Sequence, residues 1–221
     1  MGEEVNIITQ LHESTSRDYL ARMLDDKVGC MKTAKLYGQD YWDGARRFGY
    51  GGYKFIPGRW SMVAQALIER YDLNNHSRIL DVGCGKGFLL HEIKNILEGI
   101  EVIGLDISEY AISNSHDSVR VYLEQFDARE ILPFCDREFD FAFSTGLYHN
   151  FYTYEIVGAL RELQRVAKSH YLLVESYTNE IELFNLQCWA LTANSILHTS
   201  EWLWLFETAG YTGDFEFIFF K

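Results

Sequence analysis

A short glycine-rich stretch constrains the fold of this chain more than any other part of it. Residues 79–90 read I-L-D-V-G-C-G-K-G-F-L-L, an apolar run, three alternating glycines and a second apolar run. The first run suits a buried parallel strand, and the glycines permit a tight turn in which the main chain can approach a ligand. Phe88, Leu89 and Ile93 then recur at helical spacing. The pattern predicts a strand, a ligand-binding turn and a helix that begins near Lys86 and directs its N-terminal amides at the turn.

The residues beside the turn discriminate between nucleotide cofactors. The glycines are spaced G-x-G-x-G, whereas the dinucleotide fingerprint is G-x-G-x-x-G, and Asp81 precedes the first glycine by two positions. A carboxylate there repels a pyrophosphate and favours a cationic amino group or a sulfonium. We therefore expect S-adenosylmethionine as the cofactor. The alternative enzyme is an NAD(P)-dependent oxidoreductase. The other alternative is an ordinary strand-to-helix turn with no role in binding a cofactor.

Composition limits the class of protein and its partners. The chain has 221 residues, of which 48% are hydrophobic, so we expect one well-cored domain. No apolar run approaches the roughly 20 residues of a membrane helix, and the N-terminus is acidic, so we expect a cytoplasmic protein without membrane contact. A net charge of −12 disfavours nucleic acid as a partner. Four scattered cysteines indicate neither a metal site nor a disulfide framework: Cys30, Cys84, Cys135 and Cys188.

Strand and helix patterns alternate through the middle of the chain. Buried strands are expected at 79–82, 101–106, 119–126, 138–144 and 171–174, with helices at 61–71, 86–97, 109–114 and 154–167. Ser108 is the expected cap of the third helix. This alternation predicts an α/β, Rossmann-like, doubly wound and mostly parallel sheet with helices on both faces.

The two ends of the chain give weaker patterns. Residues 1 to about 15 are polar and predicted to fray, and a short lid or packing helix follows with Tyr19, Leu20 and Leu24 on one face. Residues 181–197 fit either a helix or a strand. A helix capped by Ser200 and a terminal strand at 215–220 are expected beyond them.

Polar side chains are expected where successive strands end. Asp106 lies 21 residues beyond Gly85, the separation at which a βαβ unit brings a carboxylate beside the ribose of a bound nucleoside. Asp127 follows the next strand and is placed to accept a hydrogen bond from an adenine amino group. The loop after the fourth strand holds Ser144, Tyr148 and His149. Carboxyl ends of parallel strands meet at one edge, so these groups should converge on the glycine turn.

The segment from Tyr37 to Trp60 interleaves glycines with aromatic residues and three arginines. Flexible glycine and amphipathic rings can wrap a ligand, while Arg46, Arg47 and Arg59 could hold a carboxylate or phosphate. The alternative is an aromatic loop packed on the domain edge, with its arginines paired to acidic residues. We expect residues 1–60 to form a helical and aromatic N-terminal lid over a domain of residues 61–221.

By its ordered motifs the chain resembles the class I S-adenosylmethionine-dependent methyltransferases, specifically the small single-domain bacterial type. L-D-V-G-C-G-K-G at 80–87, G-L-D-I-S at 104–108 and F-D-F-A-F-S at 139–144 are similar to three of that family's motifs, and residues 201–211 to its late helix. The resemblance implies cofactor binding by Asp81, Gly83, Cys84, Gly85, Asp106, Ile107, Asp127, Ala128, Ser144 and Thr145. The family usually has two strands after this helix, but about ten residues remain after Gly210. Either residues 187–192 supply a strand or the sheet is one strand short.

The expected activity is methyl transfer to oxygen or nitrogen of a small acceptor that can be anionic. His149 is the candidate base for a hydroxyl acceptor, because an imidazole titrates near its working pH, and a hydrogen-bonded structural histidine is the alternative. Tyr148 and Glu175 are the other catalytic candidates. The candidate acceptor-binding residues are Arg46, Arg47, Tyr50, Tyr53, Arg59, Trp60 and Tyr177. A non-catalytic S-adenosylmethionine-binding protein is the alternative from a different functional class. Exposed aromatic residues could favour a homodimer.

Overall fold

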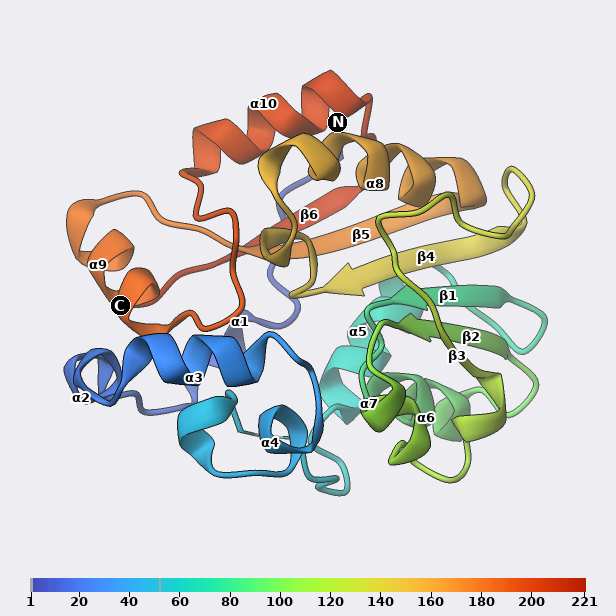
Figure 1. Cartoon of the computed structure of the whole chain (residues 1–221). Helices are drawn as coiled ribbons and strands as arrows, with labels where there is room; N and C mark the ends of the chain where they lie inside the picture. Colours follow the sequence, from blue (N-terminus) through green and yellow to red (C-terminus); the bar gives the residue numbers. More distant parts are fainter. Residues whose placement is uncertain (1, 52) are drawn as a thin grey trace.

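Six parallel strands form the central sheet of the computed structural model, which describes residues 2–51 and 53–221 (Figure 1). The strands are β1 (Arg78–Val82), β2 (Glu101–Asp106), β3 (Leu123–Gln125), β4 (Phe139–Thr145), β5 (Ala167–Glu175) and β6 (Asp214–Ile218). They lie in the order β3-β2-β1-β4-β5-β6, and each neighbouring pair runs parallel. The order reverses direction between β1 and β4, which places a ligand crevice outside the carboxyl ends of these strands.

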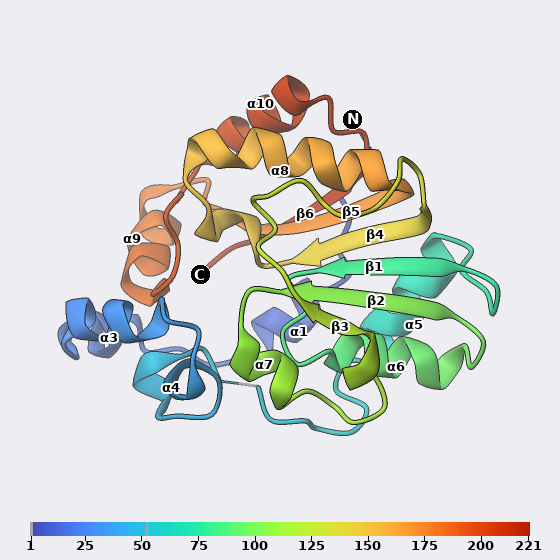
Figure 2. The same ribbon diagram turned by 45° about the vertical axis from the view of Figure 1, so that its right-hand side comes forward.

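Helices cover both faces of the sheet, as the alternating pattern predicts (Figure 2). α8 (Thr153–Val166) and α10 (Thr199–Ala209) lie on one face, α5 (Ser61–Arg70) and α6 (Phe88–Ile96) on the other, and α7 (Glu109–Ser113) follows β2. Successive side chains of a strand point to opposite faces of the sheet. Leu80 is therefore buried on the face covered by α8 and α10, and Ile79 on the face covered by α5 and α6. The predicted Rossmann-like α/β fold is confirmed. Within the described residues, no helix combines the length and the apolar character needed to cross a membrane.

The two predicted helix caps have different outcomes. Ser108 precedes α7 and its Oγ accepts a hydrogen bond from Ala111 N at 3.0 Å, so this cap is confirmed. α10 instead begins directly after His198, whose Nδ1 accepts from Ser200 N at 3.1 Å. The prediction of Ser200 as the cap is wrong, because that residue already lies inside the first turn of the helix.

The region after β5 decides how the sheet ends. Residues 180–189 form α9 (Glu180–Trp189), so the stretch 187–192 is a helix end and a loop and supplies no strand. β6 then pairs directly with β5, with Leu172 opposite Phe215. Of the two expectations for this region, the sheet that is one strand short is confirmed, and the edge beyond β6 is open for another segment.

The N-terminal segment, which we predicted to fray, occupies this open edge. Glu4 forms a parallel bridge with Phe215 of β6. The Glu216 carboxylate is 1% exposed, and it accepts hydrogen bonds from Ile7 N at 2.8 Å and from Thr9 N at 2.7 Å. The prediction of a frayed N-terminus is wrong for the described residues from 2 onward, and Met1 lies outside them. A buried carboxylate on β6 requires donors, and the main chain at the start of α1 (Thr9–Glu13) supplies them.

The rest of the N-terminal segment crosses the carboxyl ends of the strands (Figure 2). It contains α2 (Tyr19–Leu24), α3 (Lys27–Ala34), α4 (Gln39–Trp42) and η1 (Arg46–Phe48). Leu20 and Leu24 are exposed, whereas Tyr19 packs against Trp189 and Phe220, so only one end of the expected apolar face of α2 packs inward. The side chain that α2 buries is Arg22, which donates to the carbonyl oxygens of Arg46 and Gly49, both at 2.7 Å. A buried arginine therefore ties α2 to the aromatic segment.

Candidate active site

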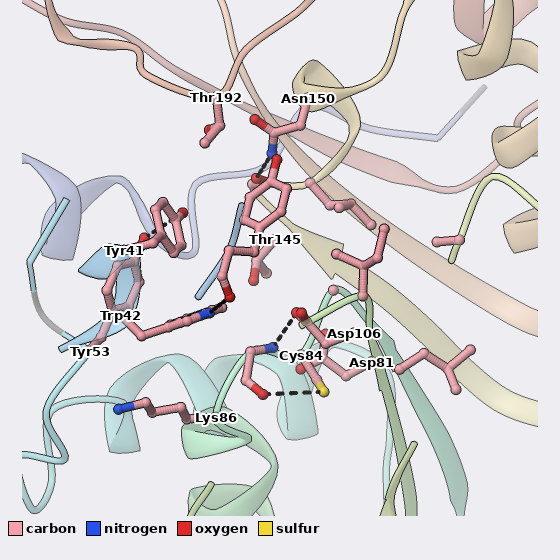
Figure 3. Close-up of a pocket in the computed structure, with 18 of the residues that line it drawn as sticks. Tyr41, Trp42, Tyr53, Asp81, Cys84, Lys86, Asp106, Thr145, Asn150 and Thr192 are labelled. Carbon is pink, nitrogen blue, oxygen red and sulfur yellow. Dashed lines mark hydrogen bonds between the residues drawn. The ribbon is translucent and has the colours of Figure 1, made fainter. Parts of the chain in front are cut away.

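A cavity of about 760 Å³ opens at the carboxyl ends of β1, β2 and β4 (Figure 3). Its size falls within the roughly 300–1,000 Å³ of small-molecule sites, and it lies where the strand order reverses. One wall consists of the glycine turn and the strand ends, and the N-terminal segment between Lys35 and Trp60 provides another. The η3 turn (Tyr148–Asn150) and the loop after α9 complete the lining through Asn150, Thr192 and Asn194.

The glycine turn has the tight geometry that its sequence predicts. Gly83, Gly85 and Gly87 have φ angles of 87°, 55° and 70°, a region that other residues rarely adopt. A Cβ atom on Gly85 would lie 2.8 Å from the ring of Trp42. Both the main-chain conformation and the close approach of the aromatic segment therefore require glycine at this position.

Asp81 is a buried carboxylate that lacks a hydrogen-bond donor. Its side chain is 3% exposed at the cavity wall, and its Oδ1 has no partner among the described residues. Burial, with a smaller contribution from the nearby Asp106, raises the pKa of Asp81 well above its usual range. A buried unpaired carboxylate is unfavourable, so this atom is suited to a ligand that supplies a cationic donor such as an amino group.

Asp106 joins the end of β2 to the glycine turn. Its Oδ2 accepts a hydrogen bond from Gly85 N and its Oδ1 from Ser108 N, both at 2.8 Å. Burial raises the pKa of Asp106, although the two amide bonds oppose that shift. Each carboxylate oxygen retains acceptor capacity toward the cavity, which fits a ligand with neighbouring hydroxyl groups.

Asp127 also lies on the wall, but it has a partner that the sequence analysis missed. Arg129 donates to it through its main-chain N at 3.0 Å and its Nε at 2.9 Å. This guanidinium lowers the pKa of Asp127 and itself lines the cavity. The acidic group expected to meet an adenine edge is therefore one half of an ion pair, with Ala128 between the two.

The structure brings together nine of the ten residues expected to bind the cofactor. The exception is Ser144, which is 0% exposed and donates a hydrogen bond to Val82 O at 2.6 Å, so it ties β4 to β1 behind the wall. The nine on the wall are Asp81, Gly83, Cys84, Gly85, Asp106, Ile107, Asp127, Ala128 and Thr145.

The three catalytic candidates do not line the cavity. His149 is 4% exposed, its Nε2 lies 3.6 Å from Glu175 Oε2, and burial lowers its pKa. Its main-chain O accepts hydrogen bonds from Asn194 N and Ser195 N at 3.0 Å. Tyr148 is 1% exposed and donates to a carbonyl oxygen of α8. The expectation that His149 converges on the glycine turn is therefore wrong: η3 turns its side chain into the core beside Glu175, while its main-chain O anchors the loop that holds Asn194.

The acceptor-binding candidates divide into two groups. Tyr53, Arg59 and Trp60 line the cavity. Four candidates do not: Arg46, Arg47, Tyr50 and Tyr177. Arg47 forms an ion pair with Asp25 at 2.8 Å, which matches the alternative of arginines paired to acidic residues, whereas Arg46 donates to the main-chain Tyr50 O at 3.1 Å. The Tyr50 hydroxyl accepts from Leu191 N and Thr192 N, and Tyr177 bridges to His198. These four residues hold the loops that carry the lining.

Several lining residues were missed by the sequence analysis. Three come from the aromatic segment, whose composition was the available signal: Tyr37, Tyr41 and Trp42. The Tyr41 and Tyr53 hydroxyls lie 2.8 Å apart, and burial raises the pKa of both phenols. Trp42 Nε1 donates to Ser108 Oγ at 2.8 Å. The lining from residues 35–60 is therefore mainly aromatic, and its charged members are Lys35 and Arg59.

A buried ion pair connects the aromatic segment to the glycine turn. Lys86, inside the turn, is 7% exposed, and its Nζ lies 2.7 Å from both carboxylate oxygens of Asp43. Tyr110 of α7 donates to the same carboxylate at 2.9 Å. These hydrogen bonds fix the segment across the turn and neutralise the lysine, so the charge available to a ligand on this side is that of Asp81 and Asp106.

Comparisons with known proteins identify the domain that carries this site. The family model described as a methyltransferase domain matches residues 79–170. The mitochondrial arginine-hydroxylase NDUFAF5 of Mus musculus is 27% identical over 128 residues, which cover 57% of this chain and 36% of that protein. Its counterpart in Rattus norvegicus is 27% identical over 109 residues, or 49% and 31% of the two chains. The chain spans about a third of the length of these curated relatives.

Solved structures share the fold at low sequence identity. A methyltransferase in complex with the Haloferax volcanii Trm112 methyltransferase activator is 20% identical, with a TM-score of 0.55, over 89% of this chain and 77% of that one. A SAM-dependent methyltransferase from Archaeoglobus fulgidus is 22% identical, with a TM-score of 0.53, over 78% and 72% of the two chains. These likenesses support the fold, and the family model supports the methyltransferase domain within it.

Proposed function

Because this chain belongs to the class I S-adenosylmethionine-dependent methyltransferases, we propose that it transfers a methyl group to a small acceptor that carries an anionic group. One observation supports this proposal above others. A single cavity contains both the unpartnered Asp81 carboxylate at the glycine turn and a separate aromatic wall with Arg59. The cavity therefore has room for a cofactor at the strand ends and an acceptor beside it.

The residues at the strand ends suit S-adenosylmethionine. Asp81 would hold the amino group of its methionine part, Asp106 the ribose hydroxyls, and the main chain around Ala128 the adenine. When bound, this cofactor supplies a methyl carbon that its positive sulfur has already activated. The chain then has to align the acceptor with that carbon and exclude water. The aromatic segment does the second of these tasks, since Lys86 and Asp43 hold it across the turn.

Arg59 supports an acceptor with a carboxylate or phosphate. Arg59 lines the cavity, and among the described residues its side chain forms no ion pair. Lys35 also lines the cavity and donates to Asn194 at 2.5 Å. An anionic group of the acceptor would gain a charge-assisted hydrogen bond from Arg59.

Two further predictions from the sequence are separate from this proposal. We predict a homodimer and a cytoplasmic location.

Calorimetry and a turnover assay test the function. We expect the full-length protein to bind S-adenosylmethionine and not NADH, and to release S-adenosylhomocysteine when given the anionic fraction of a small-molecule cell extract. Arg59→Gln should raise the acceptor KM about tenfold, the loss expected for one charge-assisted hydrogen bond. Arg161→Gln, at an exposed position on α8, is the matched control and should leave KM unchanged.

Each alternative gives a different result. Tight NADH binding without S-adenosylmethionine binding would support the oxidoreductase. Cofactor binding with no turnover in any fraction would support a non-catalytic binding protein. Turnover confined to uncharged or cationic compounds would support methyl transfer but contradict the proposal that the acceptor is anionic.

A further inference from the structure

Asn150 has a buried amide oxygen that lacks a hydrogen-bond donor. The residue lies in η3 and lines the cavity, and its Oδ1 has no partner within the described residues. Its Nδ2 donates to Gly146 O at 3.3 Å, and its main-chain O accepts from Asn194 Nδ2 at 2.7 Å. The first bond orients the side-chain amide of Asn150, and the second joins its main chain to the loop that holds Asn194. An unsatisfied buried acceptor destabilises a protein, so a ligand that donates a hydrogen bond to this atom would be favoured.

Asn150 belongs to the acceptor part of the cavity. Figure 3 shows Asn150 and Thr192 at one end of the drawn residues and Lys86 at the other, with the Tyr41, Trp42 and Tyr53 rings along the side. A molecule placed against the aromatic wall would therefore lie beside Asn150. The Asp81 and Asp106 carboxylates, which we assign to cofactor binding, lie instead on β1 and β2.

The described lining near Asn150 contains no group suited to remove a proton. The carboxylates of the lining are those of Asp81, Asp106 and Asp127, all at the ends of the cofactor-side strands. None of the lining residues is a histidine, and burial raises the pKa of the Tyr41 and Tyr53 phenols. A hydroxyl or carbon acceptor becomes a strong nucleophile only after it loses a proton to such a base, whereas the nitrogen of a neutral amine is nucleophilic without that step.

We propose that the acceptor is a primary or secondary amine whose N–H donates to Asn150 Oδ1, and that the product is an N-methyl amine. This inference rests on the proposed function. The nitrogen lone pair forms the new N–C bond while the C–S bond of the cofactor breaks, with its electron pair remaining on sulfur. The methylated nitrogen then carries a positive charge and loses its surplus proton to water. Asn150 is a specificity residue here: its oxygen orients the N–H and so directs the lone pair.

The aromatic wall suits the charge that this reaction forms. The Trp42 and Tyr53 rings have centroids 4.6 Å apart, and the Tyr41 and Tyr53 rings 5.3 Å apart, so three rings form one contiguous surface. Aromatic faces attract a cation, and more strongly where water is excluded. The wall would therefore stabilise the ammonium product and the transition state that resembles it.

Isotope labelling identifies the methylated atom. The full-length protein is incubated with S-adenosylmethionine that carries a trideuterated methyl group and with a small-molecule cell extract, and the products are fragmented in a mass spectrometer. We expect the label on nitrogen. Label on oxygen or carbon would overturn the amine and leave the proposed function intact. No labelled product, despite cofactor binding by calorimetry, would overturn both.

Variants at position 150 test the role of the oxygen on the amine found in that experiment. Asn150→Ala should raise the acceptor KM about tenfold while the calorimetric affinity for S-adenosylmethionine stays unchanged. Asn150→Asp places a negative charge beside the amine, which raises the amine pKa and should move the pH profile of kcat/KM upward by about one unit. Asn95→Ala, at an exposed position on α6, is the control.

The pH profile separates positioning from a structural effect. A purely structural role would lower activity in Asn150→Asp without moving the profile, and that result would overturn the assignment to Asn150. An unchanged KM in Asn150→Ala would overturn it as well.

Discussion

The two walls of the cavity are built in different ways. The cofactor wall comes from β1, β2 and the turn between β1 and α6, and its polar groups are main-chain amides and the Asp81 and Asp106 carboxylates. The aromatic wall comes from residues 35–60, and its groups are side chains, chiefly Tyr41, Trp42 and Tyr53. The first wall is anionic, and the second is largely neutral.

This difference assigns a separate task to each wall. Main-chain geometry fixes the cofactor wall, so a single substitution there disturbs several hydrogen bonds at once. The aromatic wall depends on individual rings and hydroxyls, so the loss of one hydroxyl there alters few contacts. We therefore expect changes in the first wall to affect cofactor affinity and stability, and changes in the second to affect the acceptor alone.

The largest effect is expected at Asp106. Asp106→Ala removes the carboxylate that would accept the ribose hydroxyls and leaves Gly85 N and Ser108 N without their acceptor. Charge-assisted hydrogen bonds contribute about 1.5–3 kcal/mol each, so calorimetry should show S-adenosylmethionine affinity at least about 100-fold lower. Tyr53→Phe, in the aromatic wall, should leave that affinity within about twofold. Equal losses in both variants would contradict the division between the walls.

A smaller effect is expected where the walls touch. Gly85→Ala combines a φ of 55° with a Cβ 2.8 Å from Trp42, and it should lower the free energy of unfolding in urea by about 2 kcal/mol and cofactor affinity about tenfold. Gly210→Ala is the matched control, since Gly210 has a φ of 74° but no heavy atom near the added carbon. It should lower stability by about 1 kcal/mol and leave affinity unchanged. Unchanged affinity in Gly85→Ala would show that the turn tolerates a side chain.

The smallest effect concerns pH. The pKa of Asp81 is raised, so its protonated form persists to higher pH than that of an ordinary carboxyl group. A cationic amino group favours the ionised form, so binding displaces a proton and affinity should fall several-fold as the pH is lowered through the raised pKa. Calorimetry in two buffers of different ionisation enthalpy measures this proton release. Asp81→Asn should abolish the pH dependence, and a dependence that survives would assign it to another group.

The sequence by itself determined the fold and most of the cofactor wall. Apolar runs alternate with helical patterns from Ile79 to Glu175, and this alternation admits few arrangements other than a parallel sheet with helices on both faces. Parallel neighbours end at the same edge of a sheet, so the spacing between Gly85 and Asp106 was sufficient to place one beside the other. The spacing of apolar residues and the pairing of parallel strands follow regular rules, so both could be inferred from the sequence.

Tertiary structure decided the rest, because those contacts depend on side-chain direction and on pairs far apart in sequence. Spacing did not indicate that η3 turns His149 inward and leaves Asn150 on the cavity. Nor did it indicate that Glu216 would order the N-terminus, since these residues are more than 200 positions apart. The composition of residues 37–60 predicted a ligand-binding surface, but only packing decided that its rings, and not Arg46 or Arg47, face the cavity.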